Sequence, residues 1–504
     1  MEYIYVDSTN GNDDNVGSSP ETAIKTISCL NERLKNVKAG TQILFCREYE
    51  YRGCLTLNID GTEMAPIKFG AYGEGKAPLI RGVDGNTPFI IYSEYVTIED
   101  LEFTNPDGHV CVYVESHKDG VHRGITVRNC FFHDVNLDMT WINHDSGGVA
   151  FFADGDKPNW FDGILIENNR FDRLARCGVY IYSSWTKRYI YQDWGNKNNY
   201  VSDTDGWYPN KNVIIRNNVF NSMSGDSVVV SGCDGALVEY NTVANSRLFK
   251  HIKRRIHFAC LWAYCSDNCV FQYNEVYGNC SDYNSDDLQA FDADLTCRNC
   301  IFQYNYSHDN AGGFMLFCCY DKASIGDTVN TIVRYNLSIN DGEGVVNGYV
   351  PRSVFTFTGE VNNSKIYNNT VYIAKPGVKL LWLADWAHKG ASFENVFSNN
   401  IFYAKPNTEI TYGIESVKSL LLDTNIFYGM DLPKDENVTV KNAIIEDPMF
   451  VNAGYDGRGR DIGELYRLKE SSPALSGGLF IEDNGGKDYF GNKTDGKFFG
   501  AFSK

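Results

Sequence analysis

Polar and apolar residues alternate over short segments along most of the chain, and turn residues separate these segments. Segments such as NVIIRNN and SVVVSGCDGALVEYN have the two-residue period of half-buried β-strands. A helical period occurs near the N-terminus, in ETAIKTISCLNERLKN, between the strand-like segments YIYVD and TQILFC. The pattern predicts an all-β chain that begins with a cap containing one short helix.

One phrase, apolar-x-x-Asn-x-apolar, recurs about every 31 residues. A fixed period of this length is typical of a solenoid, in which each repeat packs on its neighbours. The repeated asparagines are Asn169, Asn218, Asn241, Asn274, Asn305, Asn336, Asn369 and Asn400. Stacked asparagine side chains can satisfy one another and the turn backbone. Short β-coils with such a ladder predict a right-handed parallel β-helix of roughly ten or more coils.

The period also predicts the domain organisation. We expect residues 1–60 to form an N-terminal cap, 61–430 the coils, and 431–504 the closing strands and loops of one structural domain. Two intervals are longer than the period: 39 residues separate Cys130, which occupies the ladder position, from Asn169, and 49 separate Asn169 from Asn218. Insertions in solenoids form loops, often on the binding face, although they can also merely shield a coil edge.

The net charge of the chain limits the kinds of molecule that it is expected to bind. The net charge of −18 and the pI near 5.0 argue against nucleic acid and anionic membranes. No apolar run reaches the length of a membrane-spanning helix. Because no signal peptide is visible, the sequence as written predicts a cytoplasmic protein, or a secreted one if a leader has been trimmed. The cysteines concentrated between Cys260 and Cys319 are expected to be buried thiols.

Candidate chemistry lies in the segment QAFDADLTC. If Phe291 and Ala293 face the core, Asp292 and Asp294 face outward with Cα atoms about 6.6 Å apart. Two nearby carboxylates suit glycoside hydrolysis, in which one donates a proton and the other activates water or attacks. The alternatives are a solvated strand face or a calcium site.

Aromatic and charged residues extend this candidate site. We expect outward side chains on neighbouring coils at Trp262, Tyr264, Met315 and Phe317, and on an earlier coil at Tyr180 and Tyr182. Aromatic faces bind the apolar faces of sugar rings, so Trp185 and Trp207 of the longer insertion are also candidate substrate-binding residues. The turn after the next repeat adds His308 and Asp309 as supporting catalytic candidates.

A basic loop and an acidic loop occupy corresponding places one coil apart. Arg254 and Arg255 belong to the basic loop and would grip the carboxylate or sulfate of an anionic sugar. The acidic loop contains Asp282, Asp286 and Asp287. The two loops could instead neutralise each other, and the three aspartates would suit calcium. We otherwise expect no cofactor.

Over nearly its whole length the chain resembles the pectin-lyase-like right-handed β-helices of carbohydrate-active enzymes. The resemblance rests on the opening YVDSTNGNDDNVGSSPETAIKTI, the asparagine-corner repeats and the ending SSPALSGG…GAF. It implies the fold more strongly than the reaction, because this fold hosts hydrolases, lyases, epimerases and adhesins. Two late segments, LWLADW and YGIESVKSLLLDTN, resemble β-helical β-xylosidases, which implies Asp385 and Glu415 as a second candidate catalytic pair one coil apart.

Three functions remain open. The carboxylate pair favours a glycoside hydrolase that acts on poly- or oligosaccharides, with Asp292 and Asp294 as acid and base. The basic loop favours a polysaccharide lyase acting on uronates, which would use a basic residue to abstract a proton. A non-catalytic β-helix that binds glycans is the third alternative. In each case the expected partner is a carbohydrate.

Overall fold

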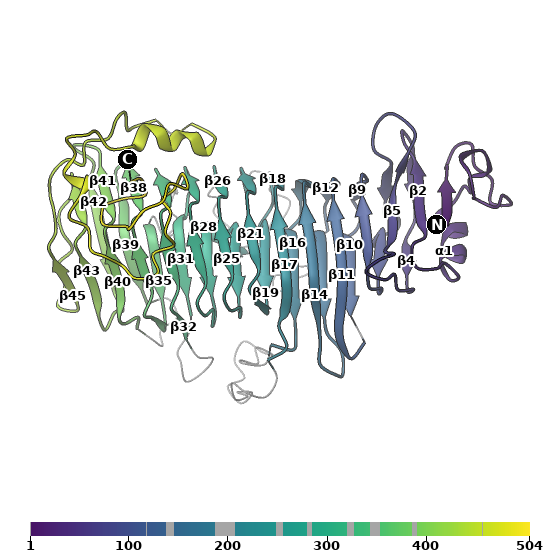
Figure 1. Ribbon diagram of the computed structural model, residues 1–504, viewed down its shortest axis with the longest axis horizontal. Helices are drawn as coiled ribbons and strands as arrows, with labels where there is room; N and C mark the ends of the chain where they lie inside the picture. The colour runs from purple at the N-terminus through teal and green to yellow at the C-terminus, as the bar shows by residue number, and fades with distance from the viewer. Residues whose placement is uncertain are drawn as a thin grey trace. The chain divides into compact units, whose positions relative to one another are not determined.

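The computed structural model describes residues 2–116, 118–137, 146–186, 207–247, 256–279, 285–319, 327–342, 353–385, 391–455 and 457–503. The described residues up to Leu237 form one compact unit, and those from Val238 onward form a second. Within each unit, strands of successive coils pair in parallel and contribute to three sheets, which we call sheets 1, 2 and 3 (Figure 1). The predicted all-β, parallel β-helical architecture is confirmed.

In the first unit, sheet 1 contains β1 (Tyr3–Val6), β2 (Gln42–Cys46), β5 (Ile67–Tyr72), β8 (Val96–Glu99), β11 (Gly120–Arg128), β14 (Asn159–Glu167) and β17 (Asn210–Arg216), which also pairs with β20 (Cys233–Asp234). Sheet 2 contains β4 (Leu55–Leu57), β7 (Phe89–Ile91), β10 (Val110–Ser116), β13 (Gly147–Ala153), β16 (Cys177–Ser183) and β19 (Val228–Ser231). Sheet 3 contains β3 (Glu50–Arg52), β6 (Leu79–Arg81), β9 (Glu102–Asn105), β12 (Phe131–Val135), β15 (Arg170–Leu174) and β18 (Val219–Asn221).

In the second unit, sheet 1 contains β21 (Leu237–Glu239), β25 (Val270–Gln272), β29 (Ile301–Gln303), β33 (Ile332–Arg334), β37 (Lys365–Tyr367), β40 (Asn395–Ser398), β43 (Leu420–Asp423) and β45 (Val438–Lys441). Sheet 2 contains β24 (Leu261–Tyr264), β28 (Gln289–Asp294), β31 (Gly313–Cys318), β35 (Ser353–Thr358), β39 (Val378–Ala384) and β42 (Ile410–Ile414). Sheet 3 contains β22 (Thr242–Ala244), β26 (Glu275–Tyr277), β30 (Tyr306–His308), β34 (Leu337–Ile339), β38 (Thr370–Ile373), β41 (Ile401–Ala404) and β44 (Ile426–Tyr428). Two small sheets pair β23 (Ile256–Phe258) with β27 (Ser285–Asp287), and β32 (Thr328–Val329) with β36 (Val361–Asn362).

The N-terminal cap contains the predicted short helix, α1 (Ile27–Leu34). The helix begins after Thr26, whose hydroxyl accepts a hydrogen bond from the backbone N–H of Cys29 at 3.0 Å. Its Leu30 and Leu34 side chains are buried, as the amphipathic period requires. The strand-like segments on either side of it form β1 and β2, which pair in parallel.

The repeated asparagines of the second unit form the predicted ladder. The backbone N–H and the side-chain amide of Asn305 both donate to Oδ1 of Asn336, at 2.9 and 3.0 Å. The same amide also donates to the backbone carbonyl of Phe271 at 2.9 Å. This pattern runs from Asn241 to Asn425, so each ladder side chain satisfies buried backbone groups at the corner of its coil.

The ladder of the first unit tolerates the two long intervals. The backbone N–H of Cys130 donates to Oδ1 of Asn169 at 2.9 Å, which confirms that Cys130 occupies the ladder position. The backbone N–H of Asn169 donates to Oδ1 of Asn218 at 2.9 Å, although 49 residues separate the two. The additional residues therefore do not interrupt the coil-to-coil register.

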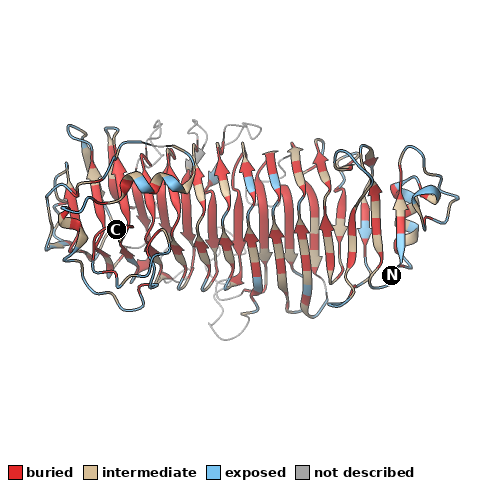
Figure 2. Cartoon of the chain, turned by 45° about the horizontal axis from the view of Figure 1, so that its top comes forward, coloured by how far each residue is buried: buried red, intermediate tan, exposed pale blue. Residues whose placement is uncertain are grey.

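Apolar side chains fill the interior of the coils. Figure 2 shows that buried residues follow the strands, whereas exposed residues concentrate in the connecting segments. In the first unit, Phe103, Phe132, Phe171 and Phe220 stack on successive strands of sheet 3 with ring centroids 4.7–5.1 Å apart. In the second, Cys269 and Cys300 precede paired strands and lie side by side as buried thiols. Among the described residues, no helix is both long and apolar enough to span a bilayer.

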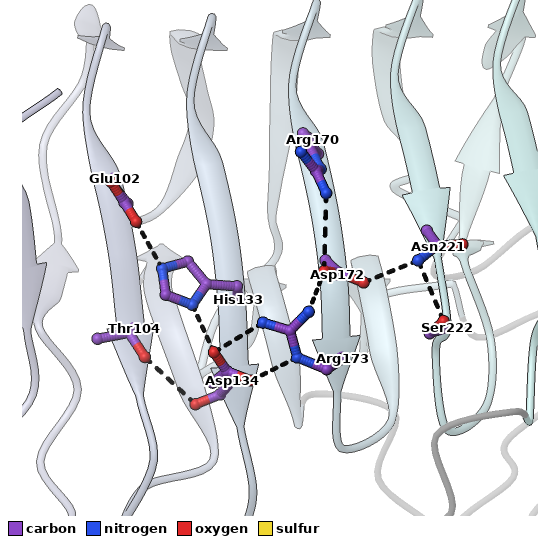
Figure 3. A network of polar contacts seen from close by, with 9 residues as sticks. All are labelled: Glu102, Thr104, His133, Asp134, Arg170, Asp172, Arg173, Asn221 and Ser222. Atoms are coloured by element: carbon purple, nitrogen blue, oxygen red, sulfur yellow. Dashed lines mark hydrogen bonds and ion pairs between the residues drawn. The ribbon is translucent and has the colours of Figure 1, made fainter. Parts of the chain in front are cut away.

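A chain of charged groups crosses the outer face of sheet 3 in the first unit (Figure 3). The His133 ring lies between two carboxylates, with Nε2 2.8 Å from Oε1 of Glu102 and Nδ1 2.7 Å from Oδ2 of Asp134. The Arg173 guanidinium donates to both oxygens of Asp134, at 2.7 and 2.9 Å, and to Asp172. Hydrogen bonds between side chains thus connect three neighbouring coils.

The C-terminal residues of the second unit pack against its coils. The hydroxyl of Tyr306 on β30 donates to the carbonyl of Gly457 at 2.8 Å. The backbone N–H of Gly459 donates to Oε1 of Glu275 on β26 at 2.6 Å. Tyr489 from the same segment belongs to one buried apolar cluster with Tyr306. The segment includes the short 3-10 helices η2 (Arg460–Tyr466) and η3 (Pro473–Leu475), and it covers the outer face of sheet 3.

Candidate active site

The segment QAFDAD forms β28, a strand of sheet 2 in the second unit. Phe291 and Ala293 are fully buried in the core, so Asp292 and Asp294 lie on the outer face of the sheet. Asp292 is nevertheless only 4% exposed, whereas Asp294 is partly buried. Both carboxylates are therefore largely withdrawn from water while facing away from the core.

The preceding coil places aromatic side chains beside these carboxylates. In the parallel register, Trp262 of β24 pairs with Asp292, and Tyr264 pairs with Asp294. The Trp262 and Tyr264 rings meet edge to face, with centroids 6.3 Å apart. Trp262 is nearly buried, whereas Tyr264 is partly exposed. The neighbours that strand alternation predicted on this side are thus present.

The following coil differs from the expectation. Its register pairs Phe291 with Met315 and Asp292 with Leu316, so Met315 and Phe317 face the core. Both alternating sets of β31 are apolar, and the alternation alone could not decide which set points inward. The side chain that instead lies next to Asp294 on this side is Cys318.

The environment of Asp294 favours its protonated form. Burial raises the pKa of this carboxyl to about 7, and the nearby charge of Asp287 acts in the same direction. Hydrogen bonds from the Cys318 thiol and from the backbone N–H of Leu295, the latter at 2.8 Å, oppose the increase. Burial likewise raises the pKa of Cys318 well above its usual range, helped by the carboxylates around it. A carboxyl group that retains its proton near neutral pH can act as a general acid.

Asp287 joins this group as a third carboxylate. It ends β27, its Oδ2 lies 3.7 Å from Nδ1 of His257, and its charge acts on both Asp294 and Cys318. The sequence pointed to Asp287 as a calcium ligand rather than as a neighbour of Asp294. Asp287 and Leu288 both have a left-handed backbone, with φ of 67°, so the strand alternation that located Asp292 and Asp294 does not extend back to Asp287.

The other members of the acidic and basic loops, Asp282, Arg254 and Arg255, lie outside the described residues, and so does the Asp286 side chain. Across the part of the chain that the structure describes, no three His, Cys, Asp or Glu side chains are arranged to hold a metal ion. The calcium site and the anion-binding loop therefore stay predictions.

His308 and Asp309 lie on a different sheet from the carboxylates of β28. His308 ends β30 of sheet 3, and its Nδ1 lies 2.8 Å from Oδ2 of Asp309. Its Nε2 lies 3.5 Å from Oε1 of Glu275, and its ring stacks on Tyr306 beneath the C-terminal segment. The structure does not bring this pair together with Asp292 and Asp294.

Asp385 and Glu415 lie side by side on adjacent coils of sheet 2, as their spacing predicted. The backbone N–H of Asp385 donates to Oε2 of Glu415 at 3.3 Å. The indole N–H of Trp382 donates to Oε1 of the same carboxylate at 2.8 Å. Glu415 is exposed and Asp385 is partly exposed. Glu415 is thus more exposed than either Asp292 or Asp294.

The remaining aromatic candidates belong to the first unit. Tyr180 and Tyr182 lie on the outer face of β16, and their rings stack with centroids 5.9 Å apart. Trp185 is nearly buried, and Trp207 is partly exposed. The bridge between Thr186 and Trp207 closes the base of the long insertion.

Comparison with known proteins supports the fold. The family described as the right-handed β-helix region matches residues 79–247. A lacto-N-biosidase of Bifidobacterium longum is 26% identical over 491 residues, which cover 81% of this chain but 29% of the relative. The chain thus spans less than a third of the length of that curated relative.

Two solved structures extend the comparison. The GH136 lacto-N-biosidase of Eubacterium ramulus is 22% identical, with a TM-score of 0.60 over 82% of this chain and 68% of that one. XylC in complex with xylose is 11% identical, with a TM-score of 0.53 over 99% of this chain and 98% of that one. These likenesses establish the architecture, and the chain therefore has the right-handed parallel β-helix fold.

Proposed function

We propose that the protein is a glycoside hydrolase whose catalytic carboxylates lie on the outer face of sheet 2 in the second unit. The observation that carries the proposal is the environment of Asp294, whose pKa is raised to about 7 beside Asp292 and Asp287. Glycoside hydrolysis requires a protonated carboxyl and an ionised carboxylate near the same bond. Asp294 is the candidate for the protonated carboxyl, and Asp292 and Asp287 are the candidates for the ionised carboxylate.

Asp294 acts as the general acid in this proposal. Its carboxyl proton passes to the glycosidic oxygen as the bond to the anomeric carbon breaks. A second carboxylate either attacks the anomeric carbon or takes a proton from the attacking water. Asp292 is the partner that strand alternation favours, and Asp287 is the partner that its electrostatic effect on Asp294 favours.

The aromatic side chains beside the carboxylates suit a sugar substrate. The partly exposed ring of Tyr264 lies next to Asp294 and can cover an apolar face of the sugar. Trp262 packs edge to face against Tyr264 and fixes the orientation of its ring. Because the Bifidobacterium relative is a lacto-N-biosidase, we propose an oligosaccharide substrate and expect an aryl lacto-N-bioside to be the first compound to test.

The test is hydrolysis of a panel of aryl glycosides, oligosaccharides and uronate-containing polysaccharides. The variants Asp294→Asn, Asp292→Asn and Asp287→Asn are compared with Asp495→Asn, which changes an exposed aspartate of the C-terminal segment. Loss of the general acid should lower kcat by about 10²–10⁴-fold. Asp495→Asn should retain wild-type activity.

The three cluster variants also decide which carboxylate is the partner of Asp294. Of Asp292 and Asp287, the partner is the residue whose replacement by asparagine lowers turnover as much as Asp294→Asn does. Wild-type activity in all three cluster variants would place the reaction elsewhere, with Asp385 and Glu415 as the next pair to replace. Ultraviolet absorbance from unsaturated products, without hydrolysis, would instead identify a lyase.

A further inference from the structure

The outer face of sheet 2 in the first unit carries a group of aromatic side chains, which we call the aromatic surface. On β7, β10, β13 and β16, outward-facing residues that pair across neighbouring strands form two rows. The aromatic surface comprises Tyr92, Tyr113, Phe152, Tyr180 and Tyr182, with Glu115 among them. All of these except Tyr180 are partly exposed.

Four rings of this aromatic surface, those of Tyr113, Phe152, Tyr180 and Tyr182, contact one another. Tyr113 and Phe152 stack with centroids 5.2 Å apart, and Phe152 lies 5.5 Å from Tyr180 and 5.4 Å from Tyr182. Neighbouring strands hold these rings in fixed register, so binding would cost little conformational entropy. Tyrosine presents a rigid apolar ring and a hydroxyl together, which is why recognition surfaces are rich in it.

The charge of the surface indicates what it can bind. Glu115 pairs with Phe152 across the coils, and its charge raises the pKa of Tyr92, after the larger effect of burial. A carboxylate at this place repels sulfated or uronate-containing glycans, and the net charge of −18 opposes them at longer range. Carboxylate and tyrosine hydroxyls instead suit the hydroxyl groups of a neutral sugar, while the rings cover its apolar faces.

We infer that this aromatic surface is a binding site for neutral oligosaccharides, separate in its residues from the carboxylate cluster of the second unit. Each position along a row advances by about 4.8 Å from coil to coil. From β7 to β16 the surface therefore spans about 14 Å. That length suits several linked sugars rather than a single one. The inference does not depend on the proposed hydrolysis, because binding here requires no turnover.

The experiment measures calorimetric binding of neutral oligosaccharides to the full chain carrying Asp294→Asn, which prevents hydrolysis under the proposed function. In this background, Tyr113→Ala combined with Tyr182→Ala should weaken binding at least about tenfold, as removal of two anchoring aromatics does at recognition surfaces. Tyr455→Ala, which removes an exposed tyrosine of the second unit, should leave the affinity unchanged.

Milder variants keep the result interpretable if the double variant unfolds. Tyr113→Phe with Tyr182→Phe removes only the hydroxyls, and Glu115→Gln removes only the charge. Each should weaken binding of neutral sugars by at least about threefold while thermal unfolding stays unchanged. Glu115→Gln should also reduce the discrimination against uronate oligosaccharides.

Three outcomes would overturn the inference. The first is unchanged affinity in every aromatic variant that folds. The second is preferential binding of anionic glycans to the parent chain. The third is a concentration-dependent dimer that the same variants abolish, because the surface would then bind a second copy. Failure of the proposed hydrolysis is distinct, since it appears as absent turnover in the wild-type chain whatever the aromatic variants bind.

Discussion

At the scale of single residues, the thiol of Cys318 provides a sensitive test of the candidate site. The thiol donates a hydrogen bond that lowers the pKa of Asp294, against the larger effect of burial. Because the general acid must hold its proton, kcat/KM should fall as the pH rises through about 7. Replacing Cys318 by alanine removes the donor, raises the pKa of Asp294 and should move this decline upward by about half a pH unit.

The matched control is Cys318→Ser, which retains a donor of similar size. It should leave the decline of kcat/KM near its wild-type pH. The measurement is a pH–rate profile of all three proteins with one aryl glycoside. A downward shift in Cys318→Ala, or equal shifts in both variants, would show that this thiol does not set the protonation of the acid.

Two histidines of the first unit, the half-buried His133 and the buried His122, should respond to pH in opposite directions. Burial alone would lower the pKa of His133, but its hydrogen bonds to Glu102 and Asp134 outweigh burial and raise it above 6.5. Its stabilising contribution is therefore fully present below pH 6.5 and is lost as the pH rises through the folded value. Burial lowers the pKa of His122, which favours the neutral ring, so the folded state loses stability as the pH falls below 6.5.

Urea unfolding of His133→Gln and His122→Gln at about pH 5.5 and about pH 8 tests this contrast. The stability lost on replacing His133 should be larger at the lower pH. The stability of His122→Gln relative to the wild type should instead improve there. The same pH trend in both variants would contradict the opposite pKa shifts of His133 and His122.

At the scale of the structural element, a second ladder ends on a buried acid. The backbone N–H of Asn279 donates to Oδ1 of Asn310 at 3.3 Å, and the amide of Asn310 donates to Oδ1 of Asp341 at 2.9 Å. The Ser338 hydroxyl donates to the other oxygen of Asp341 at 2.7 Å. Burial raises the pKa of Asp341 to about 6, so its ionised form is disfavoured in the folded protein.

Replacing Asp341 by asparagine should therefore stabilise the second unit at neutral pH. The amide keeps the acceptor for Asn310 and can donate to Ser338, while the buried charge disappears. Above about pH 6 the gain should be on the order of 2 kcal/mol, and it should shrink as the pH falls toward 4, because protonation then relieves the wild type. Chemical denaturation of the wild type and Asp341→Asn at pH 7 and pH 4.5 measures this gain in the free energy of unfolding. A gain of the same size at both pH values would contradict the raised pKa of Asp341.

The main ladder should be costly to interrupt. Asn305→Ala removes the acceptor for Asn274 and the donor to the carbonyl of Phe271, all at buried positions. Each buried backbone group left unpaired costs about 1–3 kcal/mol, so we expect a loss of several kcal/mol in the free energy of unfolding. Asn437→Ala, at an exposed position, is the control and should change stability by less than about 0.5 kcal/mol. If Asn305→Ala and Asn437→Ala lowered the free energy of unfolding equally, the asparagine ladder would contribute little to stability.

At the scale of the whole molecule, the C-terminal segment should stabilise the second unit. It contributes the large apolar side chains Tyr466, Tyr489, Phe499 and Phe502 to a buried cluster on the outer face of sheet 3. Burial of each such side chain contributes about 1.5–3 kcal/mol. A chain shortened after residue 455 should therefore lose protection from hydrogen exchange in β30, β34 and β38, while the strands of the first unit keep theirs. Unchanged exchange in these strands would contradict the packing.

The sequence predicted the repeating coils and their asparagine ladder, but it did not predict the features that occur only once. The period identified the coils because an asparagine recurs at the same corner, and its spacing also correctly placed Cys130, which occupies one corner without an amide side chain. The facing of Met315 and Phe317 was wrong because both sides of β31 are apolar. Asp287 could not be connected to Asp294 across two left-handed residues. The C-terminal segment has no period that would have revealed its position over Tyr306 and Glu275.

The ladder has a consequence for how such a protein can diversify. One bond joins Asn169 to Asn218 across 49 residues, and an identical bond joins Asn305 to Asn336 across 31. The corner is the same in both, so the amount of chain between corners is free to change. New loops can therefore be tried on the rim of a coil while the frame beneath keeps its alignment. Ligand preference in such a molecule can evolve by insertion and deletion, with the scaffold left as it was.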